Sequence, residues 1–396
     1  MTTSEVFLTK LPHVPLESYQ HQDDFDDREY DEYTENGDAG RNNAHDVTNA
    51  DEKDANGKAN KPDSDLDNWL HGGSIDSDEY DTDLENDFPP EPDPPIDPTG
   101  AFLYRESCHK KGVVPVSYLT RKMGEGNLRM RYHYLGGNGT LPLARALKDN
   151  TICEELDLSD NYVEGIGASA LAQMLKENMF IVNLNISNNF IKPEGASAFA
   201  EMLEANTTLK ILSLKGNQLT DSGAKKISEA MKNNMSLSCL DLSSNCFGEE
   251  AGIHLAAGIA ANIGLNDLDL SWNGIREKGA VAVGKALAKN GSLEILDISW
   301  NGFADVGTTA LAQSLKMNKS LRVLDISNNR ISNKGAIALG HGIGKNKGLE
   351  TLLVGLNPIG EEGLEAIIKG IAANSTLKLV GFEVRMLLSV LNYNKR

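Results

Sequence analysis

Six residues recur at a fixed interval in the second half of the sequence and have side chains suited to binding another protein. Four are aspartates and two are tryptophans, and within each set neighbours lie 28 positions apart: Asp241, Asp269, Asp297, Asp325, Trp272 and Trp300. Carboxylates in a row attract cationic groups, and tryptophans are frequent hot spots at the centres of protein interfaces. We therefore predict that these residues bind a protein partner of basic or mixed charge, more weakly as salt is added.

The same residues also have a purely structural interpretation. Like charges on neighbouring strands cost stability unless hydrogen bonds or cations offset them, and the serines and backbone of the next turn could provide such hydrogen bonds. The tryptophans could roof the loop that follows each strand instead of contacting a partner. The sequence leaves both interpretations open.

Motifs for catalysis, metal binding and cofactor binding are absent from the sequence. It contains no nucleophile elbow, P-loop, HExxH pair, dinucleotide fingerprint or EF-hand loop. The cysteines form no CxxC pair and have no histidine at metal-ligand spacing. We expect no catalytic residue, no cofactor and no metal, and Cys153, which occupies a leucine position of the repeat described next, should be a core thiol.

The 28-residue interval extends through most of the chain and identifies the elements that position these side chains. An asparagine closes each strand-like block, such as LSCLDLSSN: Asn161, Asn189, Asn217, Asn245, Asn273, Asn301, Asn329 and Asn357. A second asparagine recurs in phase: Asn150, Asn178, Asn206, Asn234, Asn262, Asn290, Asn318, Asn346 and Asn374. A glycine marks the turn into a helical segment: Gly139, Gly167, Gly195, Gly223, Gly279, Gly307, Gly335 and Gly363, with Ala251 at that place in one copy.

Each copy predicts one strand and one helix. In the L-x-x-L-x-L-x-x-N block the leucines alternate, so Leu240 and Leu242 should enter the core while Asp241 faces outward. The asparagine amide should bridge backbone groups of neighbouring turns, which a stacked array would otherwise leave buried without partners. After the glycine, segments such as GASALAQMLKEN have apolar residues at helical spacing.

Stacked copies predict an α/β solenoid, a horseshoe with a parallel inner sheet and outer helices. Nine copies fit residues 125–376, and the first is degenerate, with His133 in the asparagine position. We expect residues 101–124 and 377–396 to cap the two ends. The residues expected to cover the end repeats are Phe102, Val114 and Val116 at the first, and Leu377, Val380, Phe382, Val384 and Leu387 at the last.

The first 100 residues differ in composition from the remainder. They contain 28 Asp+Glu and 6 Lys+Arg, a net charge of −22, whereas residues 101–396 contain 29 and 32, a net charge of +3. Such a segment cannot bury enough apolar surface to offset backbone ordering of roughly 1–2 kcal/mol per residue, so we predict that residues 1–100 form a disordered acidic tail. Its two apolar islands, 6–8 with Leu11 and 69–70, are either docking motifs or chance. The sequence leaves open whether the tail binds in trans or folds back over the horseshoe.

The repeat resembles the ribonuclease-inhibitor-like class of the leucine-rich repeat family, whose units have the same length and contain an α-helix. The resemblance covers about residues 125–376 and rests on the L-x-x-L-x-L-x-x-N block and a Gly-Ala helix start, as at Gly167 and Gly335. The arrangement is most similar to the leucine-rich repeat-containing protein 74 group, through an acidic stretch at 80–85 and a lead-in that runs from Cys108 to VPVS.

The resemblance implies a scaffold that binds a protein partner on the concave face of the horseshoe and is not an enzyme. It also implies two alternatives, which are GTPase activation, as in the Ran activator, and inhibition of a basic enzyme, as in ribonuclease inhibitor. The frequent cysteines of that inhibitor are missing here. An acidic concave face argues against direct nucleic-acid binding, and no apolar stretch reaches the roughly 18 residues that would predict membrane insertion. We expect a monomer in the cytoplasm, with the nucleus and the cilium as alternatives.

Overall fold

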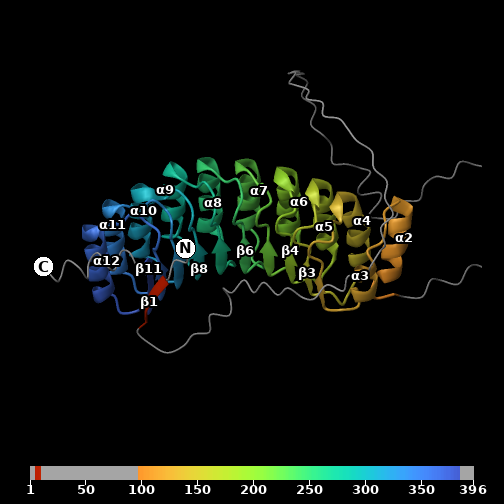
Figure 1. The fold of residues 1–396 in the computed structure, drawn as a ribbon, viewed down its shortest axis with the longest axis horizontal. Coiled ribbons are helices and arrows are strands. Elements are labelled where there is room, and N and C mark those ends of the chain that lie inside the picture. The colour runs from red at the N-terminus through yellow and green to blue at the C-terminus, as the bar shows by residue number, and fades with distance from the viewer. Residues whose placement is uncertain (1–4, 10–96, 384–396) are drawn as a thin grey trace, which may run out of the picture.

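A computed structural model describes residues 5–9 and 97–383 of the chain. Short strands lie along one side of a curved array and helices lie along the other (Figure 1). Nine three-residue strands pair in parallel, each with the next one in the sequence. They are β2 Asn127–Arg129, β3 Glu155–Asp157, β4 Asn183–Asn185, β5 Ile211–Ser213, β6 Cys239–Asp241, β7 Asp267–Asp269, β8 Ile295–Asp297, β9 Val323–Asp325 and β10 Thr351–Leu353.

A helix follows each of these strands and covers the outer side of the sheet. The helices are α4 Gly136–Leu147, α5 Glu164–Glu177, α6 Lys192–Ala205, α7 Asp221–Met231, α8 Glu249–Ala261, α9 Glu277–Ala286, α10 Ala304–Leu315, α11 Asn333–Ile343 and α12 Glu361–Ala373. Packed helices need about 8–10 Å each, whereas paired strands need about 4.8 Å, so the array curves with its strands inside. The predicted solenoid with a parallel inner sheet is confirmed.

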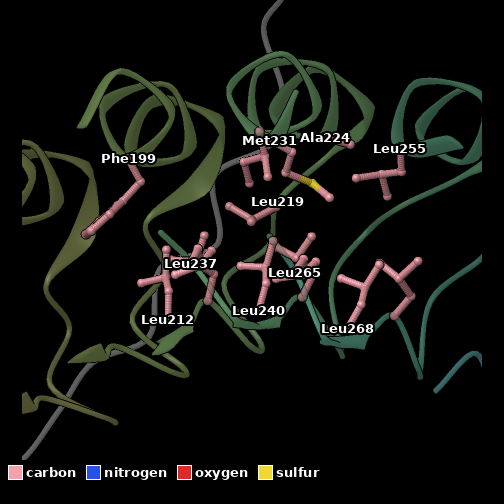
Figure 2. Close-up of a cluster of buried hydrophobic side chains, with 14 of the residues drawn as sticks. Phe199, Leu212, Leu219, Ala224, Met231, Leu237, Leu240, Leu255, Leu265 and Leu268 are labelled. Carbon is pink, nitrogen blue, oxygen red and sulfur yellow. The ribbon is translucent and has the colours of Figure 1, made fainter. Parts of the chain in front are cut away.

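The core is continuous from one repeat to the next. Leu240 and Leu242 are fully buried, as predicted, and the leucine at the centre of every neighbouring strand lies in line with Leu240. Figure 2 shows Leu212, Leu240 and Leu268 on the strands facing Met231 and Leu255 on the helices. Each such side chain contributes about 1.5–3 kcal/mol when buried. A repeat therefore depends on the neighbours that cover its two apolar faces.

Two asparagine ladders join the repeats, and the sequence predicts the bridging role of the one that closes the strand blocks. The side-chain amide of Asn245 donates to the backbone carbonyl of Leu214 in the preceding repeat at 3.1 Å, and its oxygen accepts the backbone N–H of Leu219 at 3.0 Å. On the other side of the helices, Asn262 donates to the carbonyl of Met231 at 2.7 Å. The two ladders thus satisfy backbone groups in the loops and at the C-terminal ends of the helices, which have no partner within their own strand or helix.

The recurrent glycine lies at the start of each helix, as the sequence predicts. It belongs to the first helical turn, and no left-handed backbone requires it there. A Cβ atom on Gly195 would lie 2.9 Å from Cβ of Ala168, and one on Gly307 would lie 2.8 Å from Cβ of Ala280. The glycine therefore allows helices of successive repeats to approach closely.

The N-terminal end is covered by two helices, α2 Ala101–Lys111 and α3 Ser117–Lys122. The prediction that Phe102 and Val114 cover the first repeat is wrong, because they are 59% and 89% exposed. Val116 is partly buried against the core, but the principal contacts come from Tyr104 and Leu119, which are fully buried. Helical periodicity places Tyr104 and Cys108 on the inward side of α2 and turns Phe102 toward solvent.

The C-terminal end is closed by a strand pair that connects distant parts of the sequence. Strand β11, Leu379–Glu383, extends the parallel sheet, and β1, Glu5–Thr9, pairs with it in antiparallel orientation, with Val6 opposite Phe382 (Figure 1). Val380 and Phe382 are buried and Leu377 partly buried, as predicted. The other residues predicted there, 384 and 387, lie outside the described residues, as does the tail from 10 to 96, including 69–70. Strand β1 satisfies backbone groups that an edge strand would expose.

Candidate protein-binding surface

The strand face is the surface formed by the first and third residues of β2 to β10, whose middle residues point into the core. The parallel pairing aligns the third residues of β6 to β9, so Asp241, Asp269, Asp297 and Asp325 form one row. Neighbouring strands in a sheet lie about 4.8 Å apart. The structure therefore brings the four predicted aspartates together, and this row is called the acidic ladder below.

Each carboxylate of the acidic ladder caps the turn that follows its strand. One oxygen accepts the backbone N–H of the serine two residues later, at 2.9 Å in Asp241 and at 2.8 Å in Asp269, Asp297 and Asp325. The structural interpretation of these residues thus has a real basis. However, Asn185 occupies the same position in β4 and makes the same bond to Ser187 at 3.0 Å. The turn requires a side-chain oxygen and does not require its charge.

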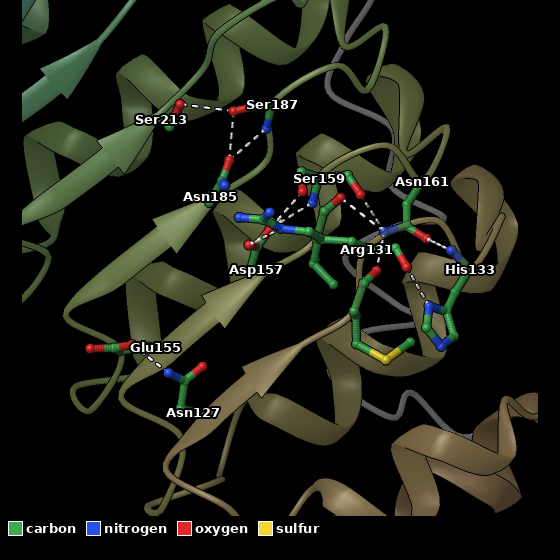
Figure 3. A network of polar contacts seen from close by, with 12 residues as sticks. Asn127, Arg131, His133, Glu155, Asp157, Ser159, Asn161, Asn185, Ser187 and Ser213 are labelled. Carbon is green, nitrogen blue, oxygen red and sulfur yellow. Dashed lines mark hydrogen bonds and ion pairs between the residues drawn. The ribbon is translucent and has the colours of Figure 1, made fainter. Parts of the chain in front are cut away.

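At the N-terminal end of the strand face one carboxylate is paired with a cation, whereas two carboxylates over β7 and β8 have no ion pair among the described residues. Asp157 accepts an ion pair from Arg131 at 2.6 Å, and Glu155 of the same strand accepts a hydrogen bond from Asn127 at 2.7 Å (Figure 3). Within the described residues, no ion pair reaches Asp269 or Asp297. Burial between neighbouring strands, together with the adjacent carboxylates, raises the pKa of each of these two groups to about 6.

Asp267 belongs to the same acidic surface, although we did not select it from the sequence. It is the first residue of β7, and Cys239 of β6 lies beside it. Burial, and next the charges of Asp269 and Asp241, raise the pKa of Asp267 to about 6, while burial and these carboxylates raise the pKa of Cys239 to about 12. The position of Asp267 in the repeat could have identified it, because side chains alternate along a strand and residues 267 and 269 therefore lie on the same face.

The tryptophan pair, Trp272 and Trp300, lies in the loops after β7 and β8. The rings stack with their centroids 3.9 Å apart and their planes inclined by 9°, and they are 54% and 39% exposed. Both residues have left-handed backbone, with φ of 53° and 52°. Residues at the same repeat position share this conformation: Tyr132 and Leu356 at the two ends of the array, and Asp160, Asn188, Gly216, Ser244 and Asn328 between them.

The left-handed backbone bears on why tryptophan occurs at these two positions. Left-handed backbone costs an ordinary L-residue about 1–2 kcal/mol and favours Gly, Asn and Asp, so the fold itself favours a small polar residue at this position. Since the two rings are more than a third exposed, they do not serve as a sealed roof over the loop. The predicted side-by-side arrangement is confirmed. Between the two end repeats this position carries a small residue except at Trp272 and Trp300, so the backbone conformation alone does not account for the two indoles.

A second set of stacked rings, the aromatic stack, lies over the first three repeats. Tyr134 and Tyr162 have ring centroids 5.7 Å apart, and Tyr162 and Phe190 have centroids 5.4 Å apart. We did not predict it, although its members follow the repeat position of the closing asparagine and are themselves 28 residues apart. Aligning the residues that follow each closing asparagine would have revealed the aromatic stack, which ends at Gln218, the residue that occupies this position in the next repeat.

The comparison with models of protein families agrees with this architecture. The family model described as "Leucine Rich repeat" matches residues 154–172, 177–200, 205–228, 233–256, 261–284, 289–312 and 318–340. The array is built of leucine-rich repeats. The solved structure "Leiomodin-1 Actin-Binding Site 2 (ABS2)" is similar over 36% of this chain and 86% of that chain, with 23% identity and a TM-score of 0.32, values that support no conclusion about a partner. Among the described residues, no helix is long and apolar enough to cross a membrane.

Proposed function

We propose that this leucine-rich-repeat protein is a non-catalytic interaction module and that its partner, a basic or mixed-charge protein, binds the strand face across β6 to β9. Repeat solenoids present extended surfaces of this kind to protein partners. The tryptophan pair is the observation that carries the proposal, because two exposed, stacked indoles occupy a backbone position that favours small polar residues. In an interface, each such ring contributes about 2 kcal/mol or more.

The acidic ladder supports a cationic partner. Its carboxylates are half-buried and close to one another, so a bound lysine or arginine would relieve their mutual repulsion as well as form its own ion pair. The gain is larger here than on an open surface, because partly buried charges are screened less by solvent and salt. Salt still screens the approach of a basic partner to this surface, so its affinity should fall as salt is added, and binding should be centred between Asp269 and Asp297.

The first test is affinity capture from native lysate with the full chain and with Trp272→Ala/Trp300→Ala. The matched control is Tyr132→Ala/Leu356→Ala, because those residues occupy the same left-handed repeat position at the two ends of the array and are also exposed. We expect a partner whose Kd rises at least tenfold with the tryptophan variant, about 1.4 kcal/mol, and is unchanged with the control.

Equal binding by all three proteins would contradict the proposal and would place the partner on the helices or on the ends of the array. Thermal unfolding of the three proteins should be compared in the same buffer. Because both double variants remove exposed side chains, similar Tm values are expected, and a loss of binding with an unchanged Tm would be a direct effect on the interface.

A further inference from the structure

A hollow of about 340 Å³ lies against Trp300 and is lined by residues of the loops that follow β7, β8 and β9. Its lining includes two arginines, Arg276 and Arg330, together with Trp300, Gly302, Asn301 and Asn328. This group of residues is called the arginine hollow here. It lies next to the tryptophan pair, and the acidic ladder lies on the strands that lead into these loops.

The absence of a side chain opens the hollow. Gly274 and Gly302 occupy the repeat position that carries Tyr134, Tyr162 and Phe190 in the aromatic stack, so the rings that fill this layer in the first repeats are missing here. Gly302 donates its N–H to the carbonyl of Ile275 at 2.9 Å and forms a parallel bridge with Arg276. The floor of the hollow is therefore held by backbone bonds between repeats.

The two arginines carry charge that the described residues do not balance. Both side chains are exposed, and neither forms an ion pair within the part of the chain that the structure describes. The charges of the surface are thus separated: Asp269 and Asp297 lie on the strand side of the tryptophan pair, and Arg276 and Arg330 lie on the loop side. In the chain, Asp269, Trp272 and Arg276 follow one another within a single repeat.

We infer that the arginine hollow is an anion-binding subsite that receives a carboxylate side chain, Asp or Glu, from the same partner segment whose basic residues face the acidic ladder. The inference rests on the proposed function and specifies its partner. Guanidinium groups bind carboxylates through paired N–H donors, and Asn328 offers an additional amide beside them. A volume of about 340 Å³ accommodates one or two side chains and not a folded element.

The separated charges fix the direction in which a partner binds. A segment with its basic residues over Asp297 and its acidic residue against Arg330 meets opposite charge at both ends, whereas the reversed segment meets like charge at both ends. Like charges in an interface are strongly unfavourable, so the surface discriminates between the two orientations. A uniformly basic segment would gain at the acidic ladder and be repelled at the arginine hollow.

The test is selection of a random peptide library on the full chain, on Arg276→Ala/Arg330→Ala and on Trp272→Ala/Trp300→Ala. Peptides enriched by the wild-type protein should share basic positions and one acidic position at a fixed distance. The arginine variant should keep the preference for basic positions and lose the preference for the acidic one. Lys289→Ala/Lys316→Ala is the control, because it removes the same charge from exposed residues just beyond the C-terminal ends of α9 and α10.

Binding of one enriched peptide and of its Glu→Gln or Asp→Asn analogue then completes the test. The arginine variant should bind the acidic peptide about tenfold more weakly than the wild-type protein does, and it should bind the acidic peptide and its neutral analogue equally well.

Two outcomes would show that the arginine hollow is not a subsite and would leave the proposed function intact. In the first, enrichment depends on the tryptophan pair but yields basic positions only. In the second, the arginine variant binds the acidic peptide as tightly as the wild-type protein does. Enrichment of phosphoserine peptides over carboxylate ones in a phosphorylated library would replace the carboxylate by phosphate and overturn the ligand assigned here. A library that yields no peptide dependent on the tryptophan pair would overturn both.

Discussion

The two halves of the strand face share one scaffold and differ in how their charges are balanced. Over β3 and β4, Asp157 is paired with Arg131, and Asn185 stands uncharged at the next position. Over β7 and β8, Asp269 and Asp297 lie side by side without an ion pair in the described residues. The turn after each strand is nevertheless the same. The repeat therefore requires a side-chain oxygen at this position, and it does not require the negative charge that accumulates farther along the strand face.

The largest expected effect is one that the two halves share. Asn189→Ala and Asn301→Ala each remove an amide that donates to the carbonyl 31 residues earlier at 2.8 Å and an oxygen that accepts backbone N–H groups of the preceding loop. Leaving these buried groups without partners should lower the free energy of unfolding by about 3 kcal/mol in both variants. Chemical denaturation measures this, and a clearly smaller loss at Asn301 would show that the scaffold is not uniform.

Lower pH should stabilise the C-terminal half. The pKa of Asp267, Asp269 and Asp297 is about 6 in the folded protein and 3.8 in the reference state, so the folded state binds more protons between these values. Stability should then rise as pH falls from 7 to 5.5, on the order of 2 kcal/mol in total for the three carboxylates. Denaturation at pH 7 and 5.5 measures it. The gain should shrink in Asp269→Asn/Asp297→Asn, and an equal gain in that variant would assign the effect to other groups.

Single charge removals should have opposite signs in the two halves. Asp269→Asn at pH 7 keeps the turn, as Asn185 does, and removes repulsion from Asp297, so stability should increase by about 1 kcal/mol. Asp157→Asn removes an ion pair whose arginine is more than half exposed and should cost between about 0 and 1 kcal/mol. If Asp269→Asn were also destabilising, the ladder would be a structural feature after all.

The sequence predicts the repeating part of the fold well because each repeat is specified by contacts with its neighbours 28 residues away. The strands, the core leucines and both asparagine ladders follow from that period, and so does the alignment of Asp269 with Asp297. The period does not reach the ends of the array, where Tyr104 replaces Phe102 as the covering residue. Nor does it reveal the pairing of β1 with β11, because a backbone pairing across almost the whole chain leaves no local signal.

The site was predicted in part for a related reason. The acidic ladder and the tryptophan pair are visible as columns of identical residues, and identity in a column is easy to recognise. The arginine hollow depends on Arg276 and Arg330, which occupy different repeat positions in different repeats, and on Gly302, where a side chain is absent. Such a feature becomes visible only when neighbouring loops are seen packed against each other in three dimensions, and no column of the repeat shows it.

The smallest expected effect concerns the backbone beneath the tryptophan pair. Trp272→Asn/Trp300→Asn introduces asparagine, which tolerates left-handed backbone and already occupies this repeat position at Asn188 and Asn328. Relief of strain at two residues should slightly exceed the loss of one ring stack, which is worth about 0.5–1.5 kcal/mol, so stability should stay the same or rise by up to about 1 kcal/mol. Binding of the partner or of the selected peptides should fall as in the alanine variant. A protein that is no less stable and no longer binds would show that the rings serve the interface at the expense of the fold, whereas a marked loss of stability would show that they hold the loops in place.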